Sequence, residues 1–262
     1  MIRFALACQA QAFTSEVLFD DVLAGDGESF GRMNSVLHTF TKLQSNLDAF
    51  GWGAGEADRM LAFTNKLRAC NGAPPLVWDP KLATNALNVI KFQCPSQKGC
   101  SLTHPSKAAG AKAGSESSYN DPSGPAGENL AYASASSWTS KGGWASVGQT
   151  PEAAAWAWYS EIKDCGGTIK APTATATGSV SGGARGACPG SGTTGHYTAL
   201  IWKTATRLGC ARSQDGQSTI CRYGGGAGFG GCNMAGLGTN TYAANLFPVS
   251  GKCQIPVIPS YS

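Results

Sequence analysis

The sequence GHYTALIW at residues 195–202, followed by GCA at residues 209–211, says most about how this chain folds. In the first segment, every second residue from His196 to Trp202 falls on one side of an extended chain. Such alternation is the pattern of a β-strand with one buried face. We therefore predict a strand over residues 196–202, and the neighbouring segments are best interpreted from it.

A β-hairpin is predicted directly downstream, with strands at residues 207–212 and 218–223 on either side of Asp215-Gly216. Asp-Gly is a strong turn dipeptide. If it forms the centre of the turn, positions 210 and 221 face each other, because both pairs of residues are centred on the same point of the chain. Both positions are cysteines, so we predict a disulfide between Cys210 and Cys221.

The ten cysteines indicate an oxidising compartment. No C-x-x-C spacing occurs, which argues against zinc knuckles and thioredoxin-type redox motifs. Cys165 and Cys188 bracket most of a tract rich in Gly, Thr, Ala and Ser, and a bridge there would restrict that loop. We predict this second disulfide. The sequence does not fix partners for Cys70, Cys94, Cys100, Cys232 and Cys253, although Cys94 and Cys100 could close a small loop.

Residues 1–12, MIRFALACQAQA, resemble a signal peptide, with one positive charge, a short apolar run and an A-x-A ending. A truncated start and a plain N-terminal tail are the alternatives. Cleavage after Ala12 would remove Cys8 and leave nine cysteines. No apolar stretch approaches the roughly 20 residues that span a bilayer. We expect a secreted protein without a membrane span.

Composition narrows the classes of partner. Charged residues make up only 14% of the chain and its net charge is +4, with lysines and arginines scattered along the sequence. A nucleic-acid partner is therefore not expected. Glycine supplies 35 of the 262 residues, which predicts long uncharged loops.

Three regions are predicted in addition to the leader, one of them with an insertion. Residues 13–55 form an N-terminal extension whose apolar spacing between Met33 and Phe50 indicates an amphipathic helix. Residues 56–250 form the main domain. Within it, residues 166–195 are expected to be a low-complexity, exposed insertion, because such a composition cannot pack a core. Residues 251–262 are expected to be a C-terminal tail.

Three helices are predicted in the main domain. One covers residues 56–70 and ends at Asn71-Gly72. The second begins at Asp79-Pro80, and Thr150-Pro151 opens the third, because a capping side chain followed by proline is a common helix start. Together with the strands, these helices predict an α+β fold.

Only three histidines occur, so each neighbourhood can be weighed. His38 lies on the polar side of the N-terminal helix, and we interpret it as a surface residue. His104 follows Cys100 in a loop, and His196 begins the predicted strand. Taken singly, a histidine is more often a satisfied structural group than a ligand, and a lone glutamate on a helix is usually solvated.

The motifs together resemble the CAP superfamily of cysteine-rich secretory, venom-allergen and plant pathogenesis-related proteins. The signature GHYTALIW with GCA is the most specific, and GENLA at residues 127–131 matches a second family motif. A further resemblance is Trp158-Tyr159 before Glu161. Another consists of Asn65, Arg68, Gly72, Pro74, Pro75, Leu76 and Trp78. The resemblance covers about residues 56–233.

The resemblance implies a three-layer α-β-α sandwich with a central antiparallel sheet. It also implies a cleft tetrad of His104, Glu128, Glu161 and His196, able to hold a divalent metal such as zinc through the two histidines. A hydrogen-bonded structural cluster is the alternative. The sequence departs from the family pattern at His104-Pro105-Ser106, and it lacks the usual partner cysteine of Cys94.

Three functions follow from these observations. The first is a secreted protein that binds a small lipid or sterol, a peptide or a partner surface. The second is a metal-assisted or Ser/His/Glu hydrolase, although neither a G-x-S-x-G elbow nor an H-E-x-x-H helix occurs. The third is an extracellular structural or defence module without pocket chemistry. The sequence defines neither the ligand nor the oligomeric state.

Overall fold

The computed structural model describes residues 55–96, 100–104, 120–121, 124–125, 127–133, 149–183, 188, 194–225 and 239–259. All of them belong to the compact unit from Asn46 to Ser262. The predicted leader at 1–12 and the predicted helix within 13–55 lie outside the described residues.

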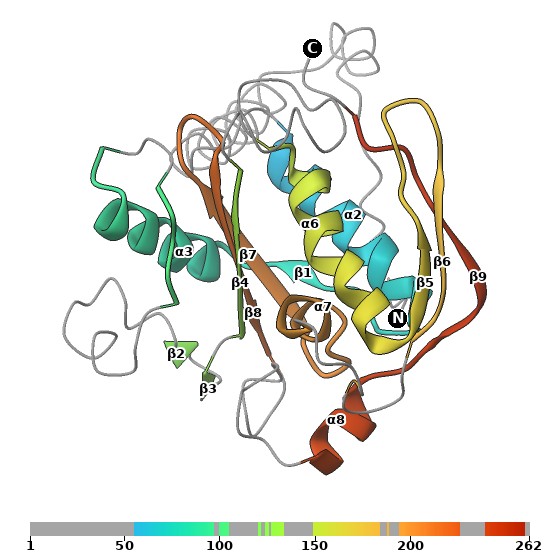
Figure 1. Cartoon of the computed structure of the whole chain (residues 1–262). Coiled ribbons are helices and arrows are strands. Elements are labelled where there is room, and N and C mark those ends of the chain that lie inside the picture. Colours follow the sequence, from blue (N-terminus) through green and yellow to red (C-terminus); the bar gives the residue numbers. More distant parts are fainter. Residues whose placement is uncertain are drawn as a thin grey trace, which may run out of the picture. The chain divides into compact units, whose positions relative to one another are not determined.

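The described elements confirm an α+β fold (Figure 1). Its helices are α2 (Glu56–Cys70), α3 (Pro80–Gln93), α6 (Pro151–Tyr159), the 3-10 helix η2 (Ser160–Cys165), α7 (Gly195–Leu200) and α8 (Thr239–Asn245). Its strands are β1 (Val77–Trp78), β2 (Asn120–Asp121), β3 (Gly124–Pro125), β4 (Gly127–Tyr132), β5 (Gly167–Lys170), β6 (Gly178–Gly182), β7 (Arg207–Arg212), β8 (Ser218–Gly224) and β9 (Val249–Ile255).

A four-stranded sheet with the order β1-β7-β8-β4 forms the centre of the fold. Strands β7 and β8 are the predicted hairpin, with Cys210 opposite Cys221 and a disulfide between them. Gly216 in the connecting turn has a φ of 69°, a conformation that favours glycine. Strand β4 pairs antiparallel with β8, whereas β1 pairs parallel with β7. The sheet is therefore antiparallel except at its β1 edge.

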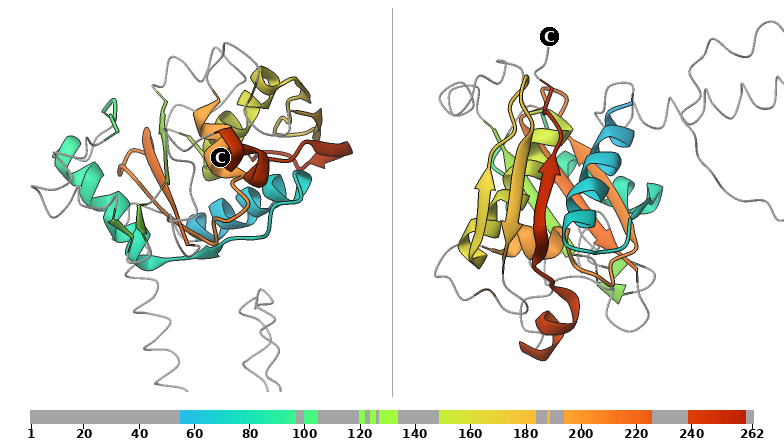
Figure 2. Two further views of the ribbon diagram at one scale, coloured as in Figure 1. Left: turned by 90° about the horizontal axis from the view of Figure 1, so that it is seen from below. Right: turned by 90° about the vertical axis from the view of Figure 1, so that its right-hand side faces the viewer.

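Helices cover both sides of this sheet. Helix α3 packs against β7 and β8, while α6 and α7 contact β4 and α2 packs against α6. Figure 1 shows α3 on one side of the strands and the α2–α6 pair on the other, and Figure 2 shows the same layers from two further directions. The helix-sheet-helix layering that the family resemblance implies is present.

Two helices begin as predicted, at a capping side chain followed by proline. The Asp79 carboxylate accepts the backbone N–H groups of Lys81 at 2.8 Å and Leu82 at 3.3 Å. The Thr150 hydroxyl accepts the N–H of Ala153 at 3.2 Å. These bonds satisfy donors that a helix start leaves free, and a lost cap costs about 1 kcal/mol.

The strand predicted at residues 196–202 is wrong, because residues 195–200 form helix α7. Residues 197–200 are all buried, and alternation within a continuous buried run does not distinguish a strand from a short helix. The helix start is stabilised from outside the segment: one oxygen of Glu161 accepts the N–H groups of His196 at 3.0 Å and Tyr197 at 3.1 Å. Nothing in the sequence near residue 196 predicts this contact with Glu161.

The expectation of an exposed insertion at 166–195 is wrong for much of its length. Strands β5 and β6 lie within it, and they form a second sheet with the order β5-β6-β9. Val180 of β6 is 1% exposed and belongs to the core. The physical reason is that β9, far away in sequence, supplies β6 with a pairing partner.

The expected tail at 251–262 is likewise wrong over its first residues, which continue strand β9 to Ile255. Ile255 and Ile258 are fully buried. A disulfide between Cys70 and Cys253 fastens β9 to the end of α2. The C-terminal segment is therefore part of the core structure.

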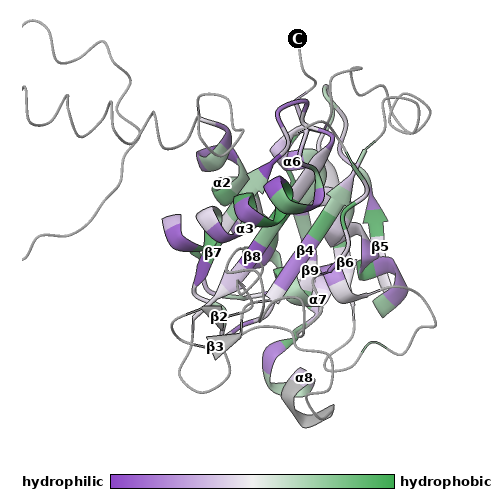
Figure 3. Ribbon diagram, turned by 90° about the vertical axis from the view of Figure 1, so that its left-hand side faces the viewer, coloured by the Kyte–Doolittle hydropathy of each residue, from purple (hydrophilic) through white to green (hydrophobic). Residues whose placement is uncertain are grey.

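Four disulfides join described cysteines, including the two predicted pairs. Cys94, which lacks its usual family partner, is joined to Cys100. Hydrophilic colour in Figure 3 is present on β4 and β8 within the sheet as well as on the helix surfaces, and Arg222 of β8 is indeed fully buried. Among the described helices, none combines the length and apolar character needed to cross a membrane.

Candidate functional site

The first histidine–glutamate pair joins the loop after α3 to strand β4. His104 Nδ1 lies 2.8 Å from Glu128 Oε1. The His104 side chain is 54% exposed, whereas that of Glu128 is 2% exposed. The pair therefore presents its imidazole to solvent from a buried carboxylate.

A buried arginine on the neighbouring strand holds Glu128 in place. Arg222 lies directly opposite Glu128 in the β4–β8 register, and its guanidinium donates to Glu128 Oε2. The Arg222 side chain is 0% exposed. A carboxylate at this depth requires such a partner, because an unpaired buried charge costs several kcal/mol. The ion pair fixes one Glu128 oxygen and leaves the other for His104.

The second pair joins η2 to helix α7. His196 Nδ1 lies 2.7 Å from Glu161 Oε1, and the other Glu161 oxygen accepts the two α7 backbone N–H groups described above. The His196 side chain is 29% exposed and the Glu161 side chain 14%. The Trp158 ring lies beside the imidazole, with 6.5 Å between ring centroids. Here the carboxylate is fixed by a helix N-terminus instead of an arginine.

Both pairs give the imidazole the same orientation. An ionised carboxylate only accepts hydrogen bonds, so the Nδ1 atom that faces it must carry the proton. In the neutral ring, Nε2 then has a free lone pair. Within the part of the chain that the structure describes, neither Nε2 atom has a hydrogen-bond partner. Each ring can thus offer a base or a metal ligand.

Asn129 of β4 contacts the backbone of the second histidine. It follows Glu128 in β4, and its side-chain amide donates to the His196 carbonyl at 2.9 Å and to the Tyr223 hydroxyl oxygen at 3.0 Å. The structure therefore brings His104 together with Glu128 and His196 together with Glu161, as two separate pairs that each have a contact with β4. The Glu128–Arg222 and Asn129–His196 contacts were missed in the sequence, because nothing local indicates that β4 pairs with β8 or contacts α7.

The described residues contain no group of three or more His, Cys, Asp or Glu side chains arranged to hold a metal ion. The two imidazoles are the nitrogen donors that a divalent ion could use at this site. Two neutral imidazoles suit zinc chemically, but they make an open site in which about half of the usual four positions are left to other ligands.

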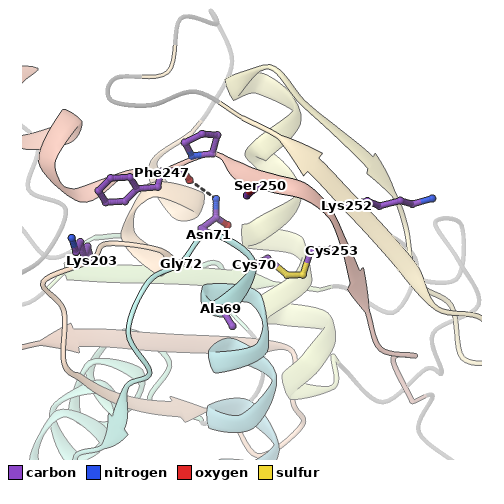
Figure 4. A pocket seen from close by; sticks show the side chains of 10 residues that line it. Ala69, Cys70, Asn71, Gly72, Lys203, Phe247, Ser250, Lys252 and Cys253 are labelled. Carbon is purple, nitrogen blue, oxygen red and sulfur yellow. Dashed lines mark hydrogen bonds between the residues drawn. A yellow bond between two sulfur atoms is a disulfide. The ribbon is translucent and has the colours of Figure 1, made fainter.

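A surface hollow of about 540 Å³ lies elsewhere, where the end of α2 meets the segment leading into β9. Figure 4 shows the Cys70–Cys253 disulfide and Asn71 in its wall, Phe247 and Lys203 at one end, and Lys252 directed away from it. The Lys203 Nζ atom lies 4.9 Å from the centre of the Phe247 ring. The hollow combines apolar surface with an ammonium group at its edge.

Fold and site define a disulfide-bonded α+β domain with two carboxylate-oriented histidines beside a central sheet. The family profile described as the cysteine-rich secretory protein family, CAP, matches residues 61–223. The chain belongs to this family, and the resemblance of its motifs is confirmed. No curated protein sequence matches the chain.

Several solved structures match this chain at low sequence identity. The structure described as NaASP2 with Zn²⁺ has 17% sequence identity and a TM-score of 0.39, covering 71% of this chain and 88% of that one. Venom allergen-like protein 4 of Schistosoma mansoni has 19% identity and a TM-score of 0.38, covering 67% and 92%. Na-ASP-1 has 17% identity and a TM-score of 0.38, covering 73% and 47%. The family assignment rests on the profile match.

Proposed function

We propose that the chain is a secreted binding domain in which His104 and His196 hold a divalent cation, with zinc as the best chemical match. The observation that supports this is the orientation of both rings: each Nδ1 atom faces a carboxylate, at 2.8 Å and 2.7 Å. Histidines that bind metals commonly make such a contact, which fixes the tautomer and raises the basicity of Nε2. Secretion is supported by the four disulfides and by the family.

The differing exposure of the pairs also favours binding over a purely structural role. A structural histidine is usually buried and satisfied at both nitrogens. His104 is 54% exposed, yet its partner Glu128 is almost completely buried and paired with Arg222. Such a rigid carboxylate behind an accessible ring suits a ligand that arrives from solvent. With only two protein ligands, water or a group of a second ligand would complete the coordination of the ion.

The test is the melting temperature of the secreted chain with zinc and with a chelator, in wild type and in the His104→Ala, His196→Ala double variant. A saturating ion at 100 times its Kd stabilises a folded protein by about 2.7 kcal/mol, which for this size raises the melting temperature by roughly 5–10 °C. The double variant should lose the shift, and a His38→Ala control should keep it. A zinc shift that survives in the double variant would refute the proposal.

A second candidate function is the binding of a small lipid or sterol, or of a peptide or partner surface, at the hollow beside β9. Its volume of about 540 Å³ lies within the usual range of small-molecule sites. Phe247 and Pro248 offer apolar contact, and Lys203 could pair with a carboxylate headgroup. Among these classes, the ammonium group favours a fatty acid over a neutral sterol.

This second function is tested by direct titration with a fatty acid and a sterol, in wild type and in Phe247→Ala. Saturable fatty-acid binding that Phe247→Ala weakens, and that the double histidine variant retains, would support a separate lipid site. Phe92→Ala on α3 is the matched control for loss of an exposed aromatic ring, because Phe92 does not line the hollow. Equal binding by wild type and Phe247→Ala would contradict this location.

A further inference from the structure

Two residues at the end of helix α2 form hydrogen bonds close to the His196–Glu161 pair. Asn71, the residue after α2, is 2% exposed, and Arg68 in its last turn is 0% exposed. The hydrogen bonds that carry the inference do not join Asn71 or Arg68 directly to His196 or Glu161. Their bonds reach instead the residues beside that pair and the far end of α7.

Asn71 bridges two tyrosines, each close in sequence to one member of the pair. The Tyr159 hydroxyl donates to Asn71 Oδ1 at 2.7 Å, and Asn71 Nδ2 donates to the Tyr197 hydroxyl oxygen at 2.9 Å. Tyr159 lies two residues before Glu161, and Tyr197 directly follows His196. The two rings also meet edge to face, with 5.4 Å between centroids. Asn71 thus links the end of α6, directly before η2, to the start of α7.

Arg68 holds the opposite end of α7. Its guanidinium donates to the carbonyl of Leu200 at 2.7 Å, of Trp202 at 3.0 Å and of Ala205 at 3.1 Å. A cation at a helix C-terminus and an anion at its N-terminus both interact favourably with the helix dipole. Glu161 supplies that anion. The six-residue helix α7 thus has a negative side chain at its N-terminus and a positive side chain at its C-terminus, each opposite in sign to that end of the dipole. Such a short helix is not stable by itself.

We propose that Asn71 and Arg68 are positioning residues for the His196–Glu161 pair, acting through the two tyrosines and α7, and that they do not position the His104–Glu128 pair. The predicted effect on zinc binding rests on the proposed function. The predicted effect on the tautomer of His196 does not, because that tautomer is measurable in the metal-free protein.

The chain offers a reciprocal control for the other pair. Gln93, the last residue of α3, forms two hydrogen bonds of 2.8 Å with the backbone of Thr103, directly before His104. Gln93→Ala should therefore loosen His104 and leave His196 unchanged. Asn71→Ala should do the opposite.

The experiment is nitrogen NMR of the histidine rings in the metal-free protein at pH 8, where a free imidazole is neutral. Wild type should show the Nδ1–H tautomer at both His104 and His196. In Asn71→Ala, the His196 signals should move toward the averaged values of a free imidazole while the His104 signals stay fixed. A Tyr159→Phe, Tyr197→Phe double variant, which keeps both rings and removes only the bridged hydroxyls, should have the same selective effect.

Zinc affinity gives the second readout. Outer-shell changes typically cost 10–100-fold in metal affinity, and we expect a loss of roughly tenfold in Asn71→Ala. Unchanged His196 signals in a folded variant, or equal changes at both histidines, would overturn the inference. If the selective NMR pattern appears but zinc does not bind the wild type, the positioning role stands and the proposed metal function fails.

Discussion

The two histidine–glutamate pairs are the same chemical unit built in two ways. In the first, Glu128 is oriented by Arg222 across two strands, and the imidazole comes from an exposed loop residue. In the second, Glu161 is oriented by the backbone of α7, and the imidazole belongs to the same helix that the carboxylate caps. The first depends on a buried ion pair and the second on a helix terminus.

The two pairs should therefore respond differently to the loss of a partner. Glu128 is almost completely buried, so it depends on one arginine for charge compensation. Glu161 is partly exposed and shares its charge among several weaker donors. We expect the loss of Arg222 to disrupt the first pair completely. The loss of any single donor to Glu161 should weaken the second pair only in part.

The largest expected difference concerns two disulfides, one next to Asn71 and the other shortly before His104. Cys70–Cys253 closes a loop with a sequence separation of 183 residues next to Asn71, whereas Cys94–Cys100 closes one of 6 before His104. If each bridge acts by lowering the entropy of the unfolded chain, removing the first costs about 5 kcal/mol and removing the second about 2 kcal/mol. Urea unfolding of the two double Cys→Ala variants measures this. Equal losses would show that loop-closure entropy does not govern how strongly these disulfides stabilise the fold.

Arg222→Met should destabilise the fold by about 3–5 kcal/mol, because Glu128 would be left buried without a cationic partner. Chemical denaturation gives the loss. The matched control is Arg59→Met, which breaks an ion pair with Glu152 whose arginine is 37% exposed, and about 1 kcal/mol is expected there. A loss no larger than that of the control would mean that Glu128 is not charged in the folded state.

Glu161→Gln should cost less, about 1–3 kcal/mol, since the amide retains one accepting oxygen for the start of α7. Thermal unfolding measures the loss, and zinc affinity should fall with it. Lys163→Gln, an exposed change in the same turn, should stay within about 0.5 kcal/mol of wild type. A Glu161→Gln variant as stable as this control would mean that Glu161 does not stabilise the start of α7.

The smallest predicted effect is a loss of folding stability at alkaline pH. Burial raises the pKa of Tyr159 and of Tyr197 well above its usual range, with the neighbouring Tyr197 adding to the shift of Tyr159. Above pH 10 the unfolded chain releases these protons and the folded chain keeps them, so stability falls as pH rises, by about 1.4 kcal/mol per tyrosine at pH 11.

Tyr159→Phe should reduce this loss between pH 9 and pH 11 by the share of one tyrosine, as measured by urea unfolding at both pH values. The comparison with wild type cancels the contribution of the lysines. An identical pH dependence in the two proteins would mean that Tyr159 is not protected from ionisation in the folded state.

The sequence predicted the fold correctly where all the residues that determine a turn or a helix start lie in one short segment. Asp215-Gly216 centred the β7–β8 hairpin and set Cys210 opposite Cys221. The caps at Asp79 and Thr150 marked two helix starts. The tetrad residues came from the family motifs, since no spacing rule brings His104 to Glu128.

The remainder depends on contacts between distant segments. Strand β4 meets β8 across some 90 residues of chain, so the Glu128–Arg222 pair has no local signature. Helix α7 owes its start to Glu161, and β6 owes its place in a sheet to β9. In each case the partner that determines the local structure lies far away in the sequence.

The proposed metal site requires that His104 and His196 both offer Nε2 to one cation. A crystal structure of the zinc-soaked protein, with anomalous scattering at the zinc edge, shows whether they do. We predict a single zinc peak about 2.0–2.1 Å from both Nε2 atoms, with each Nδ1 still facing its glutamate. A peak bonded to only one of the two histidines, or none at either, would contradict the shared site.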